Sequence, residues 1–369
     1  RSLIRKLYDV CLDDAKIVKA LETKGYGNIK ATNHDVKAVE YFMQHQLKGT
    51  SLEDSLAWIH FALTSEDVNT IAYGLMLSDG CGIILPVLEE LCNSIENFGF
   101  VSKDIPLLAR THGQPATPTT FGKELHVFSS RLQRQLNQLN SFELLVKLNG
   151  ATGNYNAHTV AYPDVNWTGF TQDFISRFNH ERVVKLVPNL ITTQIEPHDT
   201  YAELSDLFRR VNTILIDLDQ DLWRYISDDW LTQKAVSGEV GSSTMPHKVN
   251  PIDFENSEGN LGLANALFTY FSTKLPISRL QRDLSDSTVI RNFGVAFGHS
   301  LVGYRSLQKG LGKVSINEPQ IRKVLKDHPE IISEAFQTIL RREGMDLAYE
   351  TLKNLTRGKK ITLDDFKLF

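Results

Sequence analysis

One loop carries a histidine whose setting suits proton transfer. Residues 110–118 read Arg-Thr-His-Gly-Gln-Pro-Ala-Thr-Pro, so two prolines stiffen the segment around His112. Histidine exchanges protons near neutral pH, and a rigid segment is a good mount for an acid or base. Spacing alone leaves a second interpretation open, which is a solvated surface histidine.

A second segment, residues 238–251, combines glycines and serines with groups that suit an anion. It could be a flexible connector, or a lid that closes over the substrate and brings Ser242 or Ser243 into contact with it. Lys248 and Asn250 come just before a proline that fits the first turn of a helix. A helix N-terminus beside a lysine favours a carboxylate or a phosphate.

Two shorter polar segments are further candidates for substrate contacts. Asn33, His34 and Asp35 form one of them, and Thr64 with Ser65 forms the other. Thr64 and Ser65 stand at a predicted helix start, where free backbone amides are available. They could equally be simple helix caps.

Long helices must position these segments. Residues 201–225 place apolar side chains in a heptad rhythm, which predicts a long bundle helix. Similar periodicity predicts helices from residue 121, after Pro251, and over 290–311, and a further apolar helix begins at the Thr64–Ser65 cap signal. Period-two runs are limited to short stretches such as 183–187 and 190–195, which could form a hairpin or connecting strands.

The predicted fold is therefore all-α: an elongated bundle of long helices with smaller helical end domains. We expect an N-terminal helical domain over 1–53, a central bundle over 54–311 and a C-terminal helical domain over 312–369. The first residue is Arg rather than Met, so we expect the N-terminal domain to be incomplete.

Composition and missing motifs narrow the chemistry. A net charge of −4 gives no field that would recruit nucleic acid or an anionic membrane. No uncharged stretch is long enough for a membrane span, and no apolar run follows the basic N-terminus. Three irregularly spaced cysteines favour a reducing, cytoplasmic location. The chain has no phosphate-loop or zinc-protease motif, so we expect neither a nucleotide cofactor nor a metal.

Taken together, several motifs resemble one enzyme family. Residues 241–251 look like the signature loop of the fumarase/aspartase superfamily, whose lyases release fumarate by β-elimination. Residues 252–260, 111–118 and 33–40 narrow the resemblance to bacterial-type adenylosuccinate lyases, over essentially the whole chain. The resemblance implies a homotetramer built on a bundle of long helices, in which each active site draws on three subunits. It also implies that the C-terminal domain over 312–369 is truncated, because the family's pattern extends further than this sequence.

The resemblance also implies a reaction and roles for residues. Fumarate would be eliminated from adenylosuccinate, giving AMP, and from succinylaminoimidazole carboxamide ribotide (SAICAR), giving the carboxamide AICAR in purine biosynthesis. Ser242 would be the general base and His112 the general acid, with Lys248 stabilising the anion and Glu255 partnering the histidine. The substrate-binding positions would be Asn33, His34, Asp35, Thr64, Ser65, Gln194, Asn250, Arg282, Ser287 and Arg291.

Two alternatives remain at the level of sequence. A sister lyase acting on argininosuccinate, aspartate or malate would share the loops but handle a substrate without a ribose phosphate. The segment from Arg282 to Arg291 separates these possibilities, because arginine suits phosphate. A non-catalytic structural member of the superfamily would need none of Ser242, His112 and Lys248.

Overall fold

The computed structural model describes residues 2–7, 9, 11–234, 244–245, 247–358 and 361–368. The chain forms two compact units, each discontinuous in sequence. Unit 1 comprises Arg1–Asp79, Phe142–Ala202 and Thr273–Ile290, and unit 2 comprises Gly80–Ser141, Glu203–Ser272 and Arg291–Phe369. The three-domain organisation predicted from sequence stays a prediction, because units defined by contacts need not follow a linear division.

Unit 1 is mainly helical, and α4 (Ser65–Val101) begins in it and continues into unit 2. Its other elements are α1 (Ser2–Lys6), α2 (Leu12–Thr23), α3 (Asp35–Leu47), η1 (Glu53–Trp58), β3 (Glu143–Val146), α6 (Asn156–Ala161), α7 (Trp167–Ser176), η2 (Arg177–Asn179), β4 (Lys185–Pro188) and α10 (Ser287–Ile290). Helices α2 and α3 enclose a small apolar cluster of Leu21, Ala38 and Phe42.

The short strands of unit 1 exclude the hairpin, which is one of the two alternatives that the sequence left open. Residues 183–187 and 190–195 do not form a hairpin; β4 pairs in parallel with the distant β3, with Glu143 opposite Lys185. The sheet packs on the start of α4, where a Cβ on Gly74 would lie 2.8 Å from Val146 Cγ1. The Ser78 hydroxyl donates to the Val184 carbonyl at 2.7 Å. Periodicity within one segment carries no information about such a remote partner.

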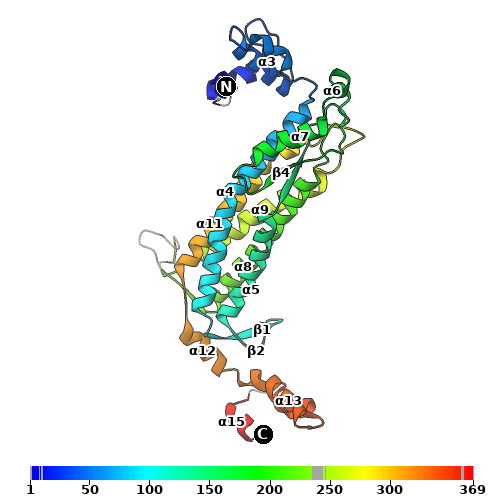
Figure 1. The fold of residues 1–369 in the computed structure, drawn as a ribbon. Coiled ribbons are helices and arrows are strands. Elements are labelled where there is room, and N and C mark those ends of the chain that lie inside the picture. Colours follow the sequence, from blue (N-terminus) through cyan, green and yellow to red (C-terminus); the bar gives the residue numbers. More distant parts are fainter. Residues whose placement is uncertain are drawn as a thin grey trace. The chain divides into compact units, whose positions relative to one another are not determined.

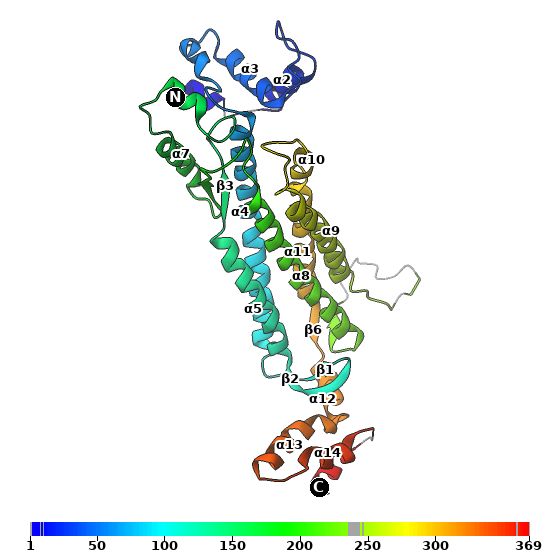
Figure 2. The ribbon, with the colours of Figure 1, turned by 90° about the vertical axis from the view of Figure 1, so that its right-hand side faces the viewer.

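Unit 2 contains the long helices that the sequence predicts. It holds most of α8 (Asp199–Ser227) and of α9 (Ile252–Lys274), together with β1 (Pro106–Thr111), β2 (Gln114–Thr120), α5 (Phe121–Asn140), β5 (Leu231–Gln233), α11 (Phe293–Lys313), β6 (Val314–Ile316), α12 (Glu318–Lys326), η3 (Pro329–Ile332), α13 (Ser333–Arg342), α14 (Ala348–Thr356) and α15 (Leu363–Leu368). Figures 1 and 2 show α5, α8, α9 and α11 running alongside one another. The heptad prediction for α8 is confirmed, since its apolar positions from Leu204 to Leu222 are buried.

The unit 2 helices pack through aromatic, small and polar side chains. The rings of Phe208 on α8 and Phe268 on α9 stack with centroids 5.6 Å apart. A buried polar link joins α8 to α11, where Tyr304 Oη donates to Asn212 Oδ1 at 2.6 Å. Close backbone approach joins α4 to α5, because a Cβ on Gly122 would lie 2.2 Å from the Gly99 carbonyl oxygen. The predicted all-α bundle is confirmed, with only two-stranded sheets in the described parts of the chain.

Helix α4 is unusually apolar. Among the described residues it is the one helix long and apolar enough to cross a membrane by length and composition. Half of its apolar stretch is buried inside the structure. Core helices of bundles share these properties, and α4 packs against other elements in both units.

Candidate active site

The predicted site residues divide between the two units. Unit 2 holds the predicted acid His112 and the residues of the signature loop and of the helix after it, which are Lys248, Asn250 and Glu255. Arg291, which directly follows α10, also belongs to unit 2. Unit 1 holds the other predicted substrate contacts, which are Asn33, His34, Asp35, Thr64, Ser65, Gln194, Arg282 and Ser287. Ser242 and Ser243 lie outside the described residues.

His112 lies at the tip of a β-hairpin rather than in an irregular loop. Strands β1 and β2 pair antiparallel up to Thr111 and Gln114, which leaves His112 and Gly113 as the two turn residues. Both have positive φ, 53° and 74°, as a tight type I′ hairpin turn requires. The turn directs an exposed imidazole that makes no hydrogen bond to the described residues. Such a histidine is free to meet a partner or substrate.

The base of the hairpin is anchored. Leu107 and Leu108 are buried, and Thr120 caps α5 by accepting from the Lys123 amide at 3.2 Å. The hairpin also contacts α12 and η3 of the same unit. A buried base beneath an exposed tip is a suitable mount for an acid.

The described part of the signature loop leads directly into α9. Pro251 precedes the first helical residue instead of lying inside the first turn, and its carbonyl accepts from the Glu255 amide at 3.3 Å. Lys248 is exposed, and its backbone amide donates to the Met245 carbonyl at 3.0 Å. The Gln233 side chain donates to the Val249 carbonyl at 2.9 Å. The lysine therefore comes just before a helix N-terminus, as expected of an anion site.

Glu255, on the first turn of α9, is predicted to partner His112. Its Oε1 instead accepts from Trp223 Nε1 of α8 at 3.2 Å, and both side chains are exposed. The described residues of this single chain contain no contact between Glu255 and His112. The partnership stays a prediction.

In unit 1 the structure brings two predicted segments together. His34 caps α3, with Nδ1 accepting from the Lys37 amide at 3.4 Å, and its Nε2 lies 3.2 Å from Ser65 Oγ. Because Nδ1 is an acceptor, a neutral imidazole carries its proton on Nε2 and donates it to the serine. Asn33, just before, has a φ of 48°, and Asp35, the first residue of α3, accepts from the Val36 amide at 2.8 Å.

A buried ion pair behind Thr64 and Ser65 was not anticipated from sequence. Asp67 and Lys147 are both fully buried, with Lys147 Nζ 2.6 Å from Asp67 Oδ1. Asp67 also accepts from the amides of Thr64 and Asn149, at 2.8 and 3.0 Å. Burial lowers the pKa of Lys147, although the Asp67 charge opposes that shift. The pair ties the start of α4 to the loop after β3, and no local sequence signal connects residues 80 apart.

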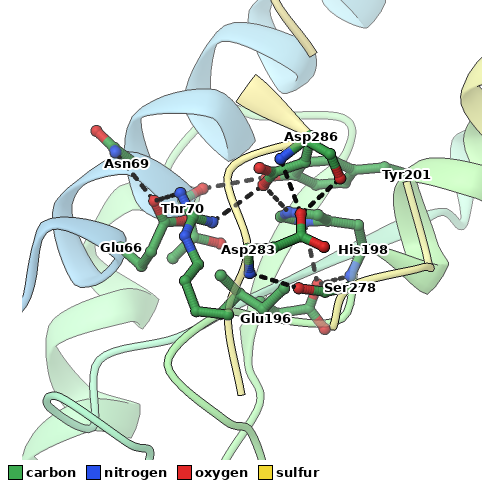
Figure 3. A network of polar contacts seen from close by, with 12 residues as sticks. Glu66, Asn69, Thr70, Glu196, His198, Tyr201, Ser278, Asp283 and Asp286 are labelled. Atoms are coloured by element: carbon green, nitrogen blue, oxygen red, sulfur yellow. Dashed lines mark hydrogen bonds and ion pairs between the residues drawn. The ribbon is translucent and has the colours of Figure 1, made fainter. Parts of the chain in front are cut away.

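Arg282, predicted to meet phosphate, is held by two carboxylates. Its Nη2 lies 3.1 Å from Glu66 Oε1, and its Nη1 lies 3.1 Å from Asp286 Oδ2. Glu66 directly follows Ser65, and Asp286 directly precedes Ser287, so the arginine joins two predicted segments. These contacts belong to a polar network that also includes Glu196 and His198 (Figure 3).

The remaining predicted contacts lie on the same connections. Gln194 is half-buried beside Thr193, whose hydroxyl donates to the Gln281 carbonyl at 2.9 Å. Ser287 begins α10, and its amide donates to the Leu284 carbonyl at 3.3 Å. Thr193 therefore ties the segment of Gln194 to that of Arg282.

Comparison with family models and solved structures gives the class of protein and its fold. The chain matches the family model described as Lyase over residues 3–265 and the model described as Adenylosuccinate lyase C-terminal over residues 278–369. It superposes on 3-carboxy-cis,cis-muconate lactonizing enzyme from Pseudomonas putida with a TM-score of 0.72 at 18% identity, covering 96% of this chain and 76% of that one. Fumarate lyase from Mesorhizobium gives 0.70 at 17% identity, covering 100% and 84%. The two solved structures therefore share the fold of this chain, and the family models define it as a lyase.

Curated relatives narrow the class further. Adenylosuccinate lyase of Escherichia coli K12 is 48% identical over 97% of this chain and 76% of its own length. The Legionella pneumophila enzyme of that name is 52% identical, over 92% and 74%, and the Dictyostelium discoideum enzyme is 50% identical, over 99% and 78%. The chain belongs to the adenylosuccinate lyase family and is a carbon–nitrogen lyase.

Proposed function

We propose that this enzyme eliminates fumarate from adenylosuccinate, giving AMP, and from SAICAR, giving AICAR, in purine and AMP biosynthesis. One observation carries the proposal beyond family membership. Four separate segments of unit 1, around residues 34, 65, 194 and 282–287, carry the predicted substrate contacts and are linked by hydrogen bonds and ion pairs. A structural role alone would not need these side-chain types at linked positions.

The proposed chemistry needs a base, an acid and a way to hold negative charge. Elimination removes a proton from carbon beside a carboxylate while the nitrogen leaving group gains one. Ser242 is the proposed base and His112 the proposed acid. A serine hydroxyl is a weak base, so Lys248 and the N-terminus of α9 stabilise its alkoxide and the charge that develops on the carboxylate.

The proposed substrate contacts follow the charges of the substrate. Thr64, Ser65 and Asn250 grip the succinyl carboxylates. Arg282, Ser287 and Arg291 meet the phosphate, since a planar guanidinium binds two oxygens at once. The other contacts are Asn33, His34, Asp35 and Gln194.

We further propose a homotetramer whose active sites are shared between subunits. What supports sharing is that His112 is exposed and has no hydrogen-bond partner among the described residues of its own chain, while Glu255 is occupied by Trp223. In the proposed assembly the His112 of one subunit meets the Glu255 of another. Glutamate then orients the imidazole and favours its protonated form.

The proposed enzyme works in the cytoplasm and needs no cofactor or metal. What supports this location is that Cys11, Cys81 and Cys92 are all free. The last two are buried, and burial raises the pKa of the Cys81 thiol to about 12, which makes it unreactive.

The direct test is fumarate release from purified enzyme supplied with adenylosuccinate, SAICAR, argininosuccinate, aspartate or malate in separate assays. We expect fumarate from the first two substrates only. Activity on argininosuccinate, aspartate or malate without activity on adenylosuccinate would replace the proposal with a sister lyase. No activity on any of them, from a folded protein, would favour the structural alternative.

A further inference from the structure

A buried histidine outside the predicted site belongs to the polar network in Figure 3. His198 is only 2% exposed, comes just before α8 and has a φ of 65°. Its Nε2 lies 3.4 Å from Asp286 Oδ2, and its backbone amide donates to Glu196 Oε2 at 2.7 Å. The ring stacks on Tyr201 with centroids 5.0 Å apart. A left-handed backbone conformation costs free energy for any residue other than glycine. Burial of an imidazole also costs free energy unless the ring is hydrogen-bonded, so the bond to Asp286 offsets part of the cost.

His198 and Arg282 contact the same carboxylate oxygen of Asp286. Asp286 Oδ2 accepts from His198 and also pairs with Arg282 Nη1, so the imidazole fixes the carboxylate that fixes the guanidinium. The hydrogen bond from His198 and the charge of Arg282 together lower the pKa of Asp286 against the opposing effect of burial. Asp286 Oδ1 is buried and has no hydrogen-bond partner among the described residues. The orientation of Asp286 therefore depends on Oδ2.

The other side of the guanidinium is held as well. Glu66 Oε1 pairs with Arg282 Nη2 and also accepts from Asn69 Nδ2 at 3.1 Å. With one Nη atom on each carboxylate, the plane of the guanidinium is set by the protein before any ligand arrives. Preorganised groups lose less freedom when they bind a ligand.

We propose that His198 is a positioning residue for nucleotide binding, which holds Arg282 in its binding orientation through Asp286. The inference rests on the proposed function, in which Arg282 meets the phosphate of the substrate. Loss of the His198 hydrogen bond frees Asp286 and lets the guanidinium turn. Binding of the phosphate-bearing product AMP then weakens, whereas fumarate, which carries no phosphate, binds as before.

Two substitutions separate the hydrogen bond from the packing. His198→Phe keeps an aromatic ring against Tyr201 but removes the donor to Asp286. His198→Gln keeps an N–H donor at about the position of Nε2. Both side chains place similar strain on a backbone with positive φ, so the difference between them reports the hydrogen bond.

A third variant controls for loss of a buried imidazole. His158 in unit 1 is 4% exposed and packs its ring at 4.9 Å from Trp167, and no contact joins it to Arg282 in the described structure. His158→Phe should lower thermal stability without changing the affinity for AMP. Thermal melting of all three variants shows which of them fold.

The experiment measures AMP and fumarate binding to the full-length enzyme by calorimetry, beside KM and kcat for adenylosuccinate. For His198→Phe we expect the AMP dissociation constant and KM to rise about tenfold to a hundredfold, with kcat and fumarate binding changed less than about threefold. His198→Gln should recover most of the AMP affinity. Equal losses of AMP and fumarate affinity, or no loss of either, would overturn the inference. Wild-type enzyme without activity on adenylosuccinate would instead overturn the proposed function.

Discussion

At the scale of single residues, the backbone explains how the predicted acid is presented. Residue types around His112 indicate a stiff segment, but only the pairing of β1 with β2 places the histidine at a turn position with positive φ. Asparagine tolerates that conformation better than alanine does. The informative substitution at this position is therefore His112→Asn.

We expect His112→Asn to lower kcat on adenylosuccinate by about 10² to 10⁴, because the leaving nitrogen loses its proton donor. Thermal stability should stay close to that of the wild type, since the hairpin turn is kept. The matched control is His180→Asn at another exposed histidine, which should keep full activity. A His112→Asn enzyme with near-normal kcat would remove this histidine from the mechanism.

Asp219 on α8 gives a prediction for pH dependence. The side chain is 1% exposed, and burial raises its pKa to about 8, with the charge of Glu258 adding to the effect. The folded state therefore holds the proton more tightly than the unfolded state, where the pKa is near 4. Asp219 therefore does not destabilise the fold below about pH 4. As the pH rises from about 4 to about 8, the free energy of unfolding decreases, and above about 8 this loss of stability is constant.

Asp219→Asn should remove this loss of stability. Urea unfolding at constant protein concentration should show the variant gaining stability over the wild type between about pH 5 and pH 8, by at most about 1.4 kcal/mol per pH unit. Activity in the folded enzyme should be retained. A stability difference that is the same at every pH would show that Asp219 is ionised in the fold.

At the scale of elements, sequence periodicity predicted the long helices well and the connections poorly. The heptad spacing of α8 predicts which face of the helix is buried, because that face depends only on the order of residues within the segment. The pairing of β3 with β4 and the ion pair of Asp67 with Lys147 join segments far apart in the chain. No local signal marks His198 as part of a polar network, since its partner Asp286 comes 88 residues later.

The contact of α4 with α5 depends on a glycine that the periodicity does not explain. A Cβ on Gly122 would lie 2.2 Å from Gly99 O and 2.6 Å from Lys103 Cα, both backbone atoms that cannot move independently. Gly122→Ala should destabilise the protein by roughly 2 kcal/mol or more, since the helices must separate. Exposed Gly312 on α11 has nothing within 4 Å, and Gly312→Ala should stabilise by about 0.5–1 kcal/mol.

Thermal melting of the two glycine variants tests the contact. Opposite shifts in melting temperature would match the close approach of the helices. Equal, small shifts would mean that the backbones at Gly122 and Gly99 do not meet in the folded protein.

At the scale of the whole molecule, the predicted site residues are divided between two units, and Ser242 and Ser243 lie outside the described residues. The proposed catalytic acid and the carboxylate expected to partner it are in one unit, but the described residues of this single chain do not join them. Sequence could name these residues from the motif resemblance, and it could not show which subunit each one serves. Shared sites predict that two inactive variants repair each other.

The most direct test mixes His112→Asn enzyme with Ser242→Ala enzyme, after reversible dissociation and reassembly. Each variant alone should keep at most about 1% of wild-type activity on adenylosuccinate and should keep the oligomeric state of the wild type. If different subunits supply the two residues, random hybrids should contain about one intact site in four and recover about a quarter of wild-type activity. Hybrids that demonstrably form and remain inactive would contradict the account of a shared active site.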